Sequence, residues 1–145
     1  MVSLTQIVPL VLAVSAVAYA ALAARVARST PQNPNNLMSF FLFLIAGMVA
    51  GSAFSYGATD ATMYGIGRTL SFFSAGFVPI VFYLIYREFT VGRPHVLTIV
   101  MLAIIPIATT GLALTNSYHS IIWMVTETAS GLQFSELLDH YWYRR

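Results

Sequence analysis

The chain has 145 residues, of which 58% are hydrophobic and 8% are charged, and its formal net charge at pH 7 is +2. A soluble domain carries roughly 25% charged residues, so this composition excludes a water-soluble globule and favours a membrane protein. The basic residues are all arginines and are scattered along the chain, which argues against nucleic-acid binding because that function needs a clustered basic face. The absence of cysteine excludes disulfides, thiolate metal sites and thiol catalysis.

Long stretches without a charged residue indicate the fold. A helix needs about 20 apolar residues to cross the hydrocarbon core of a membrane. The sequence offers such intervals at about residues 5–25, 37–57, 69–89 and 95–115. A transmembrane barrel would instead need strands of alternating polarity, and the sequence shows no such pattern. The predicted fold is all-α: a bundle of four transmembrane helices in a single membrane domain, residues 1–145.

The first span has two interpretations. Ala18, Tyr19 and Ala20 form a small-residue sequence of the kind cleaved at the end of a secretory signal peptide. The residues ahead of the apolar run contain no basic side chain, however, whereas a signal peptide begins with a basic segment. The sequence therefore favours a permanent helix.

Arginines near the span ends predict the orientation, since cytoplasmic loops are richer in basic residues. The first and third connections each carry two arginines, whereas the second has only Arg68, together with Asp60. We therefore predict that the first and third connections lie in the cytoplasm and that the N-terminus lies outside.

The segment after the fourth span, about residues 120–143, is predicted to be amphipathic or interfacial. Its apolar residues recur at i, i+3, i+4, i+7 and i+8, which is one face of a helix: Phe134, Leu137, Leu138, Tyr141 and Trp142. Ser135 suits the N-terminal cap of that helix. The helix fits either a position in the membrane interface or the entrance to a fifth span.

Small residues and prolines within the spans indicate where helices pack and bend. Gly47 and Gly51 form a GxxxG motif, which lets two helices approach closely in lipid, either within one subunit or across a homodimer. Pro79 and Pro106 lie inside the third and fourth spans, where each removes a backbone hydrogen bond and predicts either a fixed kink or a hinge.

Polar residues gather on the predicted outer side. Arg68 either extends its side chain to the lipid headgroups or binds an anion in an outward-facing cavity. Thr115 and Asn116 can hydrogen-bond the last free carbonyls of the fourth helix, and Trp123 suits the membrane interface. On physical grounds, the stretch ALTNSYHSIIW, residues 113–123, is better interpreted as the end of a helix at the membrane surface than as a ligand site.

The sequence contains no motif that supports catalysis or metal binding. The candidate metal ligands on the outer side lack an HExxH or other tight spacing: His119, Glu127, Glu136, Asp139 and His140. No acid or base lies near the middle of a span, which disfavours a proton pump or an ion transporter. We predict no metal, no cofactor and no enzymatic activity for this chain by itself.

The same stretch resembles a signature of certain bacterial and archaeal histidine kinases. At the outer end of the fourth helix of their N-terminal seven-helix region these proteins carry T-N-x-x-H-x-x-x-W, which Thr115, Asn116, His119 and Trp123 match. Tyr86–Arg93, YREFTVGR, looks like the short loop that leads into their fourth helix. The likeness extends over essentially the whole chain, which resembles the first four helices of that region.

The resemblance implies a sensory input module of a two-component system in a prokaryotic cell membrane. For such a module the candidate ligand-binding residues are Arg68, Asn116, His119 and Trp123, and the candidate hinges are Pro79 and Pro106. The implied partners are the lipid bilayer and a cytoplasmic signalling domain or protein. Two other functions stay open: a small assembly subunit of a larger membrane complex, and half of a dimeric transporter.

Overall fold

The computed structural model describes residues 4–29, 33–90, 92, 94–119, 122–128 and 131–136. Its elements are α1 (Leu4–Ser29), α2 (Asn33–Tyr56), α3 (Ala61–Thr90), α4 (Val96–Leu114), α5 (Asn116–His119), β1 (Trp123–Thr128) and β2 (Gly131–Glu136). The helices α1 to α4 are each long and apolar enough to cross a membrane. The prediction of four transmembrane helices is confirmed.

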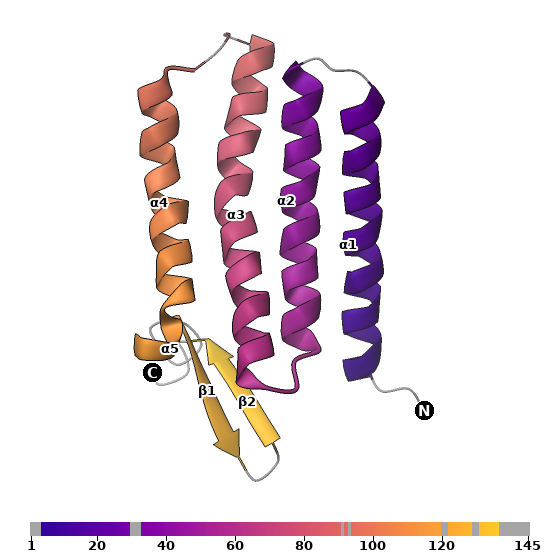
Figure 1. Cartoon of the computed structure of the whole chain (residues 1–145), viewed down its shortest axis with the longest axis vertical. Coiled ribbons are helices and arrows are strands. Elements are labelled where there is room, and N and C mark those ends of the chain that lie inside the picture. Colours follow the sequence, from indigo (N-terminus) through magenta and orange to yellow (C-terminus); the bar gives the residue numbers. More distant parts are fainter. Residues whose placement is uncertain are drawn as a thin grey trace, which may run out of the picture.

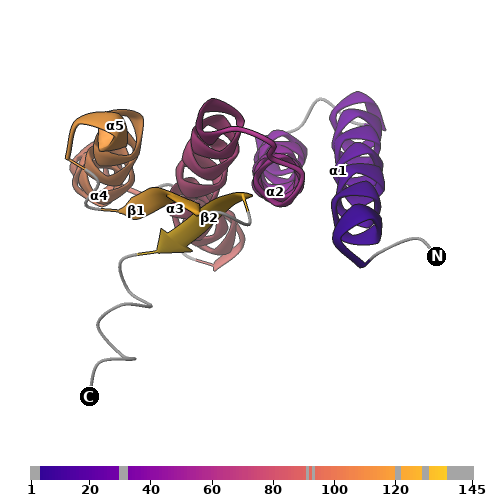
Figure 2. The same cartoon turned by 90° about the horizontal axis from the view of Figure 1, so that it is seen from below.

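The four long helices stand side by side in one row, in chain order and each antiparallel to the next (Figure 1). Contacts join α1 to α2, α2 to α3 and α3 to α4, and the view from below shows the helices as a single layer (Figure 2). One end of the row carries Arg25, Arg28 and Arg87, and we call it the arginine end. The other end carries the strands, and we call it the hairpin end.

Small residues form the contact between α2 and α3. A Cβ added to Gly51 would lie 2.5 Å from the carbonyl oxygen of Gly67 and 2.7 Å from the backbone nitrogen of Ser71. A Cβ added to Gly47 would lie 2.5 Å from the hydroxyl of Ser74. The GxxxG motif therefore faces a neighbouring helix of the same subunit, and the two backbones approach as closely as glycine allows.

Serine hydroxyls add hydrogen bonds between neighbouring helices. Ser39 Oγ donates to the carbonyl oxygen of Ala23 over 2.8 Å, and Ser71 Oγ donates to the carbonyl oxygen of Met48 over 3.2 Å. Ala16 and Ala23 are buried on the side of α1 that faces α2. Close packing and hydroxyl bonds thus join helices that gain no hydrophobic drive inside lipid.

The third helix begins earlier than predicted, at Ala61 instead of about residue 69. Asp60 explains the difference, because its Oδ1 accepts a hydrogen bond from Met63 N over 2.8 Å and so caps the first turn. Arg68, which we expected at the start of the span, consequently lies about two turns inside α3.

The connection from α3 to α4 is built from local hydrogen bonds. Gly92 has a φ of 86°, the left-handed conformation that favours glycine, and its N–H donates to the carbonyl oxygen of Arg87 over 2.8 Å. His95 caps the next helix, since its Nδ1 accepts from Leu97 N over 3.4 Å. Gly92 therefore marks the end of α3, and His95 marks the start of α4.

The strands correct the prediction for the segment after the fourth span. β1 and β2 pair along their whole lengths as an antiparallel hairpin. The amphipathic helix is therefore wrong for residues 123–136, which include Phe134 and Ser135, its proposed first residues. Residues 137–145, where most of its apolar face was expected, lie outside the described part of the chain.

Strand preference and hairpin length account for this correction. Val125, Thr126 and Thr128 are β-branched, and such residues pack well on a pleated surface. Thr128 pairs with Gly131, so only two residues connect the strands, a length typical of hairpins. Pairing across this short connection places Phe134 opposite Val125 and overrides its helical spacing.

Candidate functional site

The four candidate ligand-binding residues all lie toward the hairpin end. Arg68 belongs to α3, Asn116 and His119 to the short helix α5, and Trp123 begins β1. Figure 1 shows α5 and the strands following α4, close to the start of α3. For His119 and Trp123 the structure describes the backbone alone.

Asn116 is buried, with 3% of its surface exposed. Its side-chain Oδ1 accepts a hydrogen bond from Ile122 N over 2.8 Å. This bond ties the residue before β1 back to the end of α4. The predicted bonding of the last α4 carbonyls is found for Thr115, whose Oγ1 donates to the carbonyl oxygen of Gly111 over 2.9 Å.

Arg68 lies between two aromatic rings on its own helix. The guanidinium carbon is 5.4 Å from the centre of the Phe72 ring and 6.0 Å from the centre of the Tyr64 ring. A cation over an aromatic face is attracted by the ring quadrupole. These contacts hold the Arg68 side chain against the surface of α3.

A buried pair brings these two polar residues into one cluster. Tyr64 and Ala113 are both buried, and Phe72 and Ile122 pack against them. Arg68 contacts Tyr64, and Asn116 is hydrogen-bonded to Ile122. We call the six residues the hairpin-end cluster: Tyr64, Arg68, Phe72, Ala113, Asn116 and Ile122.

The aromatic part of the hairpin-end cluster was not predicted from the sequence. Tyr64, Arg68 and Phe72 follow one another at i, i+4 and i+8, which places them on one helix face. This spacing is visible in the sequence, but the stretch before Arg68 was expected to be a loop. Ile122 gives no local signal, because its role depends on its distant partner Asn116.

The two proposed hinges differ in their surroundings. Pro79 is exposed on α3, whereas Pro106 is buried where α4 crosses α3. A Cβ added to Gly76 would lie 2.7 Å from the Cβ of Pro106. Thr110 Oγ1 donates to the carbonyl oxygen of Pro106 over 2.6 Å, a bond within α4. At Gly76 the backbone of α3 therefore lies against Pro106 of α4, with no room for a side chain between them.

The described residues do not form a metal site. Within the described ranges, no three His, Cys, Asp or Glu residues gather closely enough to hold a metal ion. Asp139 and His140, two of the candidate ligands, lie outside those ranges. The described cluster offers a guanidinium, an amide and aromatic rings, which suit a polar or anionic group near the membrane surface.

Comparison with known proteins identifies the family. The family model for the N-terminal 7TM region of histidine kinase matches residues 9–143. Searches of the curated proteins and of the solved structures gave no significant match. The matched range includes both strands and nearly all of the four long helices, and the T-N-x-x-H-x-x-x-W residues fall inside it. The chain is thus an integral membrane protein that belongs to the family of N-terminal seven-transmembrane sensory regions of histidine kinases.

Proposed function

We propose that this chain is the signal-input part of a membrane sensor, in which a stimulus at the hairpin-end cluster displaces α4 relative to α3. That displacement would change the activity of a cytoplasmic kinase domain or signalling partner. The observation that carries the proposal is the family match over residues 9–143, because the family is the sensory region of histidine kinases. The chain needs no catalytic group of its own for this role.

The hairpin-end cluster is the proposed input site. Arg68 and Asn116 come from different helices: Arg68 contacts buried Tyr64, and Asn116 is bonded to Ile122, which packs against the same buried pair. Hydrogen bonds and charges act more strongly in such a low-dielectric setting than in water. A ligand that competes for either side chain would therefore disturb the join between α3, α4 and β1.

The proposed relay element is α4. It links the hairpin-end cluster to the arginine end as one continuous helix, and its long contact is with α3. A sensor of this kind needs two packings of one element, whose balance the stimulus shifts. The crossing at Gly76 and Pro106 supplies the pivot, and Pro79 supplies a second bending point in α3.

The proposed orientation places the arginine end in the cytoplasm and the N-terminus outside. Arg25, Arg28 and Arg87 lie at the arginine end, whereas Arg68 toward the other end is accompanied by Asp60. Cytoplasmic loops carry such an excess of arginine. A topology reporter inserted at residues 30–32 should report the cytoplasm, and an exterior signal there would overturn this orientation.

Substitutions of two signature residues that follow Asn116 in the chain, in α5 and at the start of β1, should change signalling. In a hybrid in which this region drives a histidine kinase reporter, His119→Ala and Trp123→Ala are expected to change kinase output at least about fivefold, the lower range of allosteric coupling. Tyr118→Ala is the matched control, because Tyr118 lies in the same helix and is 90% exposed. Equal output from all three variants, at equal amounts in the membrane, would place the sensing site elsewhere.

A further inference from the structure

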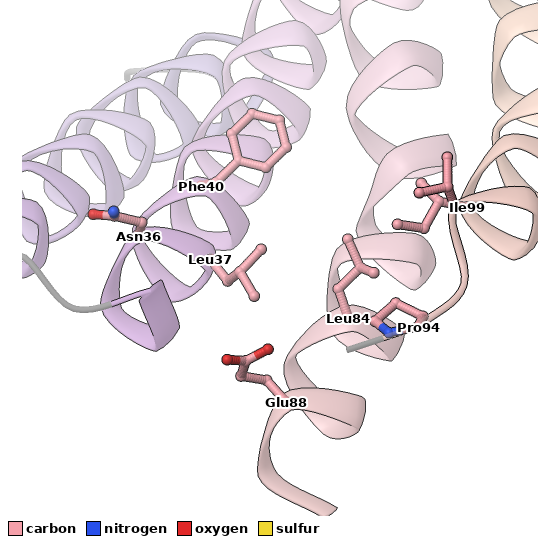
Figure 3. Close-up of a pocket in the computed structure, with 8 residues that line it drawn as sticks. Asn36, Leu37, Phe40, Leu84, Glu88, Pro94 and Ile99 are labelled. Atoms are coloured by element: carbon pink, nitrogen blue, oxygen red, sulfur yellow. The ribbon is translucent and has the colours of Figure 1, made fainter. Parts of the chain in front are cut away.

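A cleft of about 490 Å³ opens at the arginine end, between the start of α2, the end of α3 and the start of α4 (Figure 3). Its walls are largely apolar and include Leu37 and Phe40 from α2, Leu84 from α3 and Ile99 from α4. The volume lies within the usual range of sites for small molecules, roughly 300–1,000 Å³. The helix ends that line it are at the opposite end of the row from the hairpin-end cluster.

One acidic side chain lines this apolar cleft. Figure 3 shows the Glu88 carboxylate extending into the space between α2 and α3, on the side of Leu37. Among the described residues, none forms a hydrogen bond or an ion pair with that carboxylate. A carboxylate beside apolar walls favours a cationic partner, because charged hydrogen bonds strengthen where water is partly excluded.

We propose that this cleft binds an amphiphile that carries a protonated amine on an apolar chain. The ammonium group donates hydrogen bonds to the Glu88 carboxylate, and the chain lies along Leu37, Phe40 and Ile99. A neutral lipid chain would offer the carboxylate neither a charge nor a hydrogen bond, and a fatty acid would bring a second negative charge against it. The charge of the cleft therefore selects the amine. This inference does not depend on the proposed signalling role, since binding is measured directly.

The test uses photolabelling of the whole chain in nanodiscs of phosphatidylcholine. The probe is dodecylamine with a diazirine in its chain, and the comparison probes are the alcohol and the carboxylic acid of equal chain length. We expect the amine to label the peptides that contain Leu84 and Ile99 at least about tenfold more strongly than the acid does, a ratio that corresponds to about 1.4 kcal/mol. Equal labelling by the three probes would overturn the proposal and identify a slot for ordinary lipid chains.

Two variants separate the charge from the cavity. Glu88→Gln should reduce labelling by the amine about tenfold and leave labelling by the alcohol unchanged. Ile99→Trp fills the cleft without touching the carboxylate and should reduce labelling by both. Glu127→Gln in β1 is the matched control, which removes a carboxylate at the opposite end and should change nothing. Amine labelling that persists in both cleft variants, with their thermal unfolding unchanged, would contradict the proposed site.

Discussion

Replacing Gly51 with alanine is expected to lower the free energy of unfolding by about 1–3 kcal/mol, the usual cost of overpacking. The new Cβ would lie 2.5 Å from the carbonyl oxygen of Gly67 and 2.7 Å from the backbone nitrogen of Ser71. Both are backbone atoms of α3 and cannot rotate away, so α2 and α3 must separate. The hydrogen bond from Ser71 Oγ to the carbonyl oxygen of Met48 would lengthen with them.

The matched control for this prediction is Gly65→Ala. Gly65 also lies within a transmembrane helix, but a Cβ added there has no atom within 4 Å. Alanine is the better helix former by roughly 0.5–1 kcal/mol, so this variant should be as stable as the parent or more stable. Unfolding in mixed micelles, followed by circular dichroism, compares the two. Equal stability of both variants would mean that α2 and α3 do not pack through Gly51.

The second large effect is expected for Asn116→Ala. The substitution leaves Ile122 N without its acceptor in a partly buried position, and an unsatisfied buried group costs about 1–3 kcal/mol. Because this bond ties the residue before β1 to the start of α5, its loss should loosen the hairpin locally. The long helices, whose contacts lie elsewhere, should keep their stability.

Hydrogen exchange measures this effect at the bond itself. The Ile122 amide should exchange about tenfold faster or more in Asn116→Ala, since 1.4 kcal/mol corresponds to a factor of ten. Tyr118→Ala serves as the control, because its side chain is 90% exposed in the same short helix and should leave the exchange rate unchanged. Identical exchange of the Ile122 amide in Asn116→Ala and in the parent would show that the bond does not hold the hairpin to α4.

The transmembrane helices could be predicted because each one is marked by an uncharged run within its own segment, and no distant partner is needed to recognise it. The first, second and fourth spans were predicted to within a few residues of their ends. The third began too late in the prediction, because the uncharged interval begins only after Arg68, whereas the cap at Asp60 starts the helix. A cap is a local signal, so this error was avoidable.

Features that depend on distant partners could not be predicted in the same way. GxxxG indicated close packing at Gly51 but did not identify Gly67 and Ser71 as its neighbours. The role of Asn116 depends on Ile122, and the cleft is made by three helices. The hairpin was not predicted because the apolar residues from Phe134 onward have helical spacing. That spacing was given more weight than the β-branched residues between Trp123 and Thr128. The candidate site was predicted only as a set of residues, without the aromatic side chains that surround Arg68.

The most direct test of the account is the basal output of the kinase hybrid with Gly76→Ala. The added Cβ would lie 2.7 Å from the Cβ and 3.3 Å from the Cα of Pro106, so α4 must shift relative to α3 even without a stimulus. Gly111→Ala is the control on α4, since a Cβ there has no atom within 4 Å. If displacement of α4 carries the signal, Gly76→Ala should change basal phosphorylation at least about fivefold while Gly111→Ala stays within about twofold of the parent. Parental output from Gly76→Ala, at equal abundance in the membrane, would contradict the proposed relay.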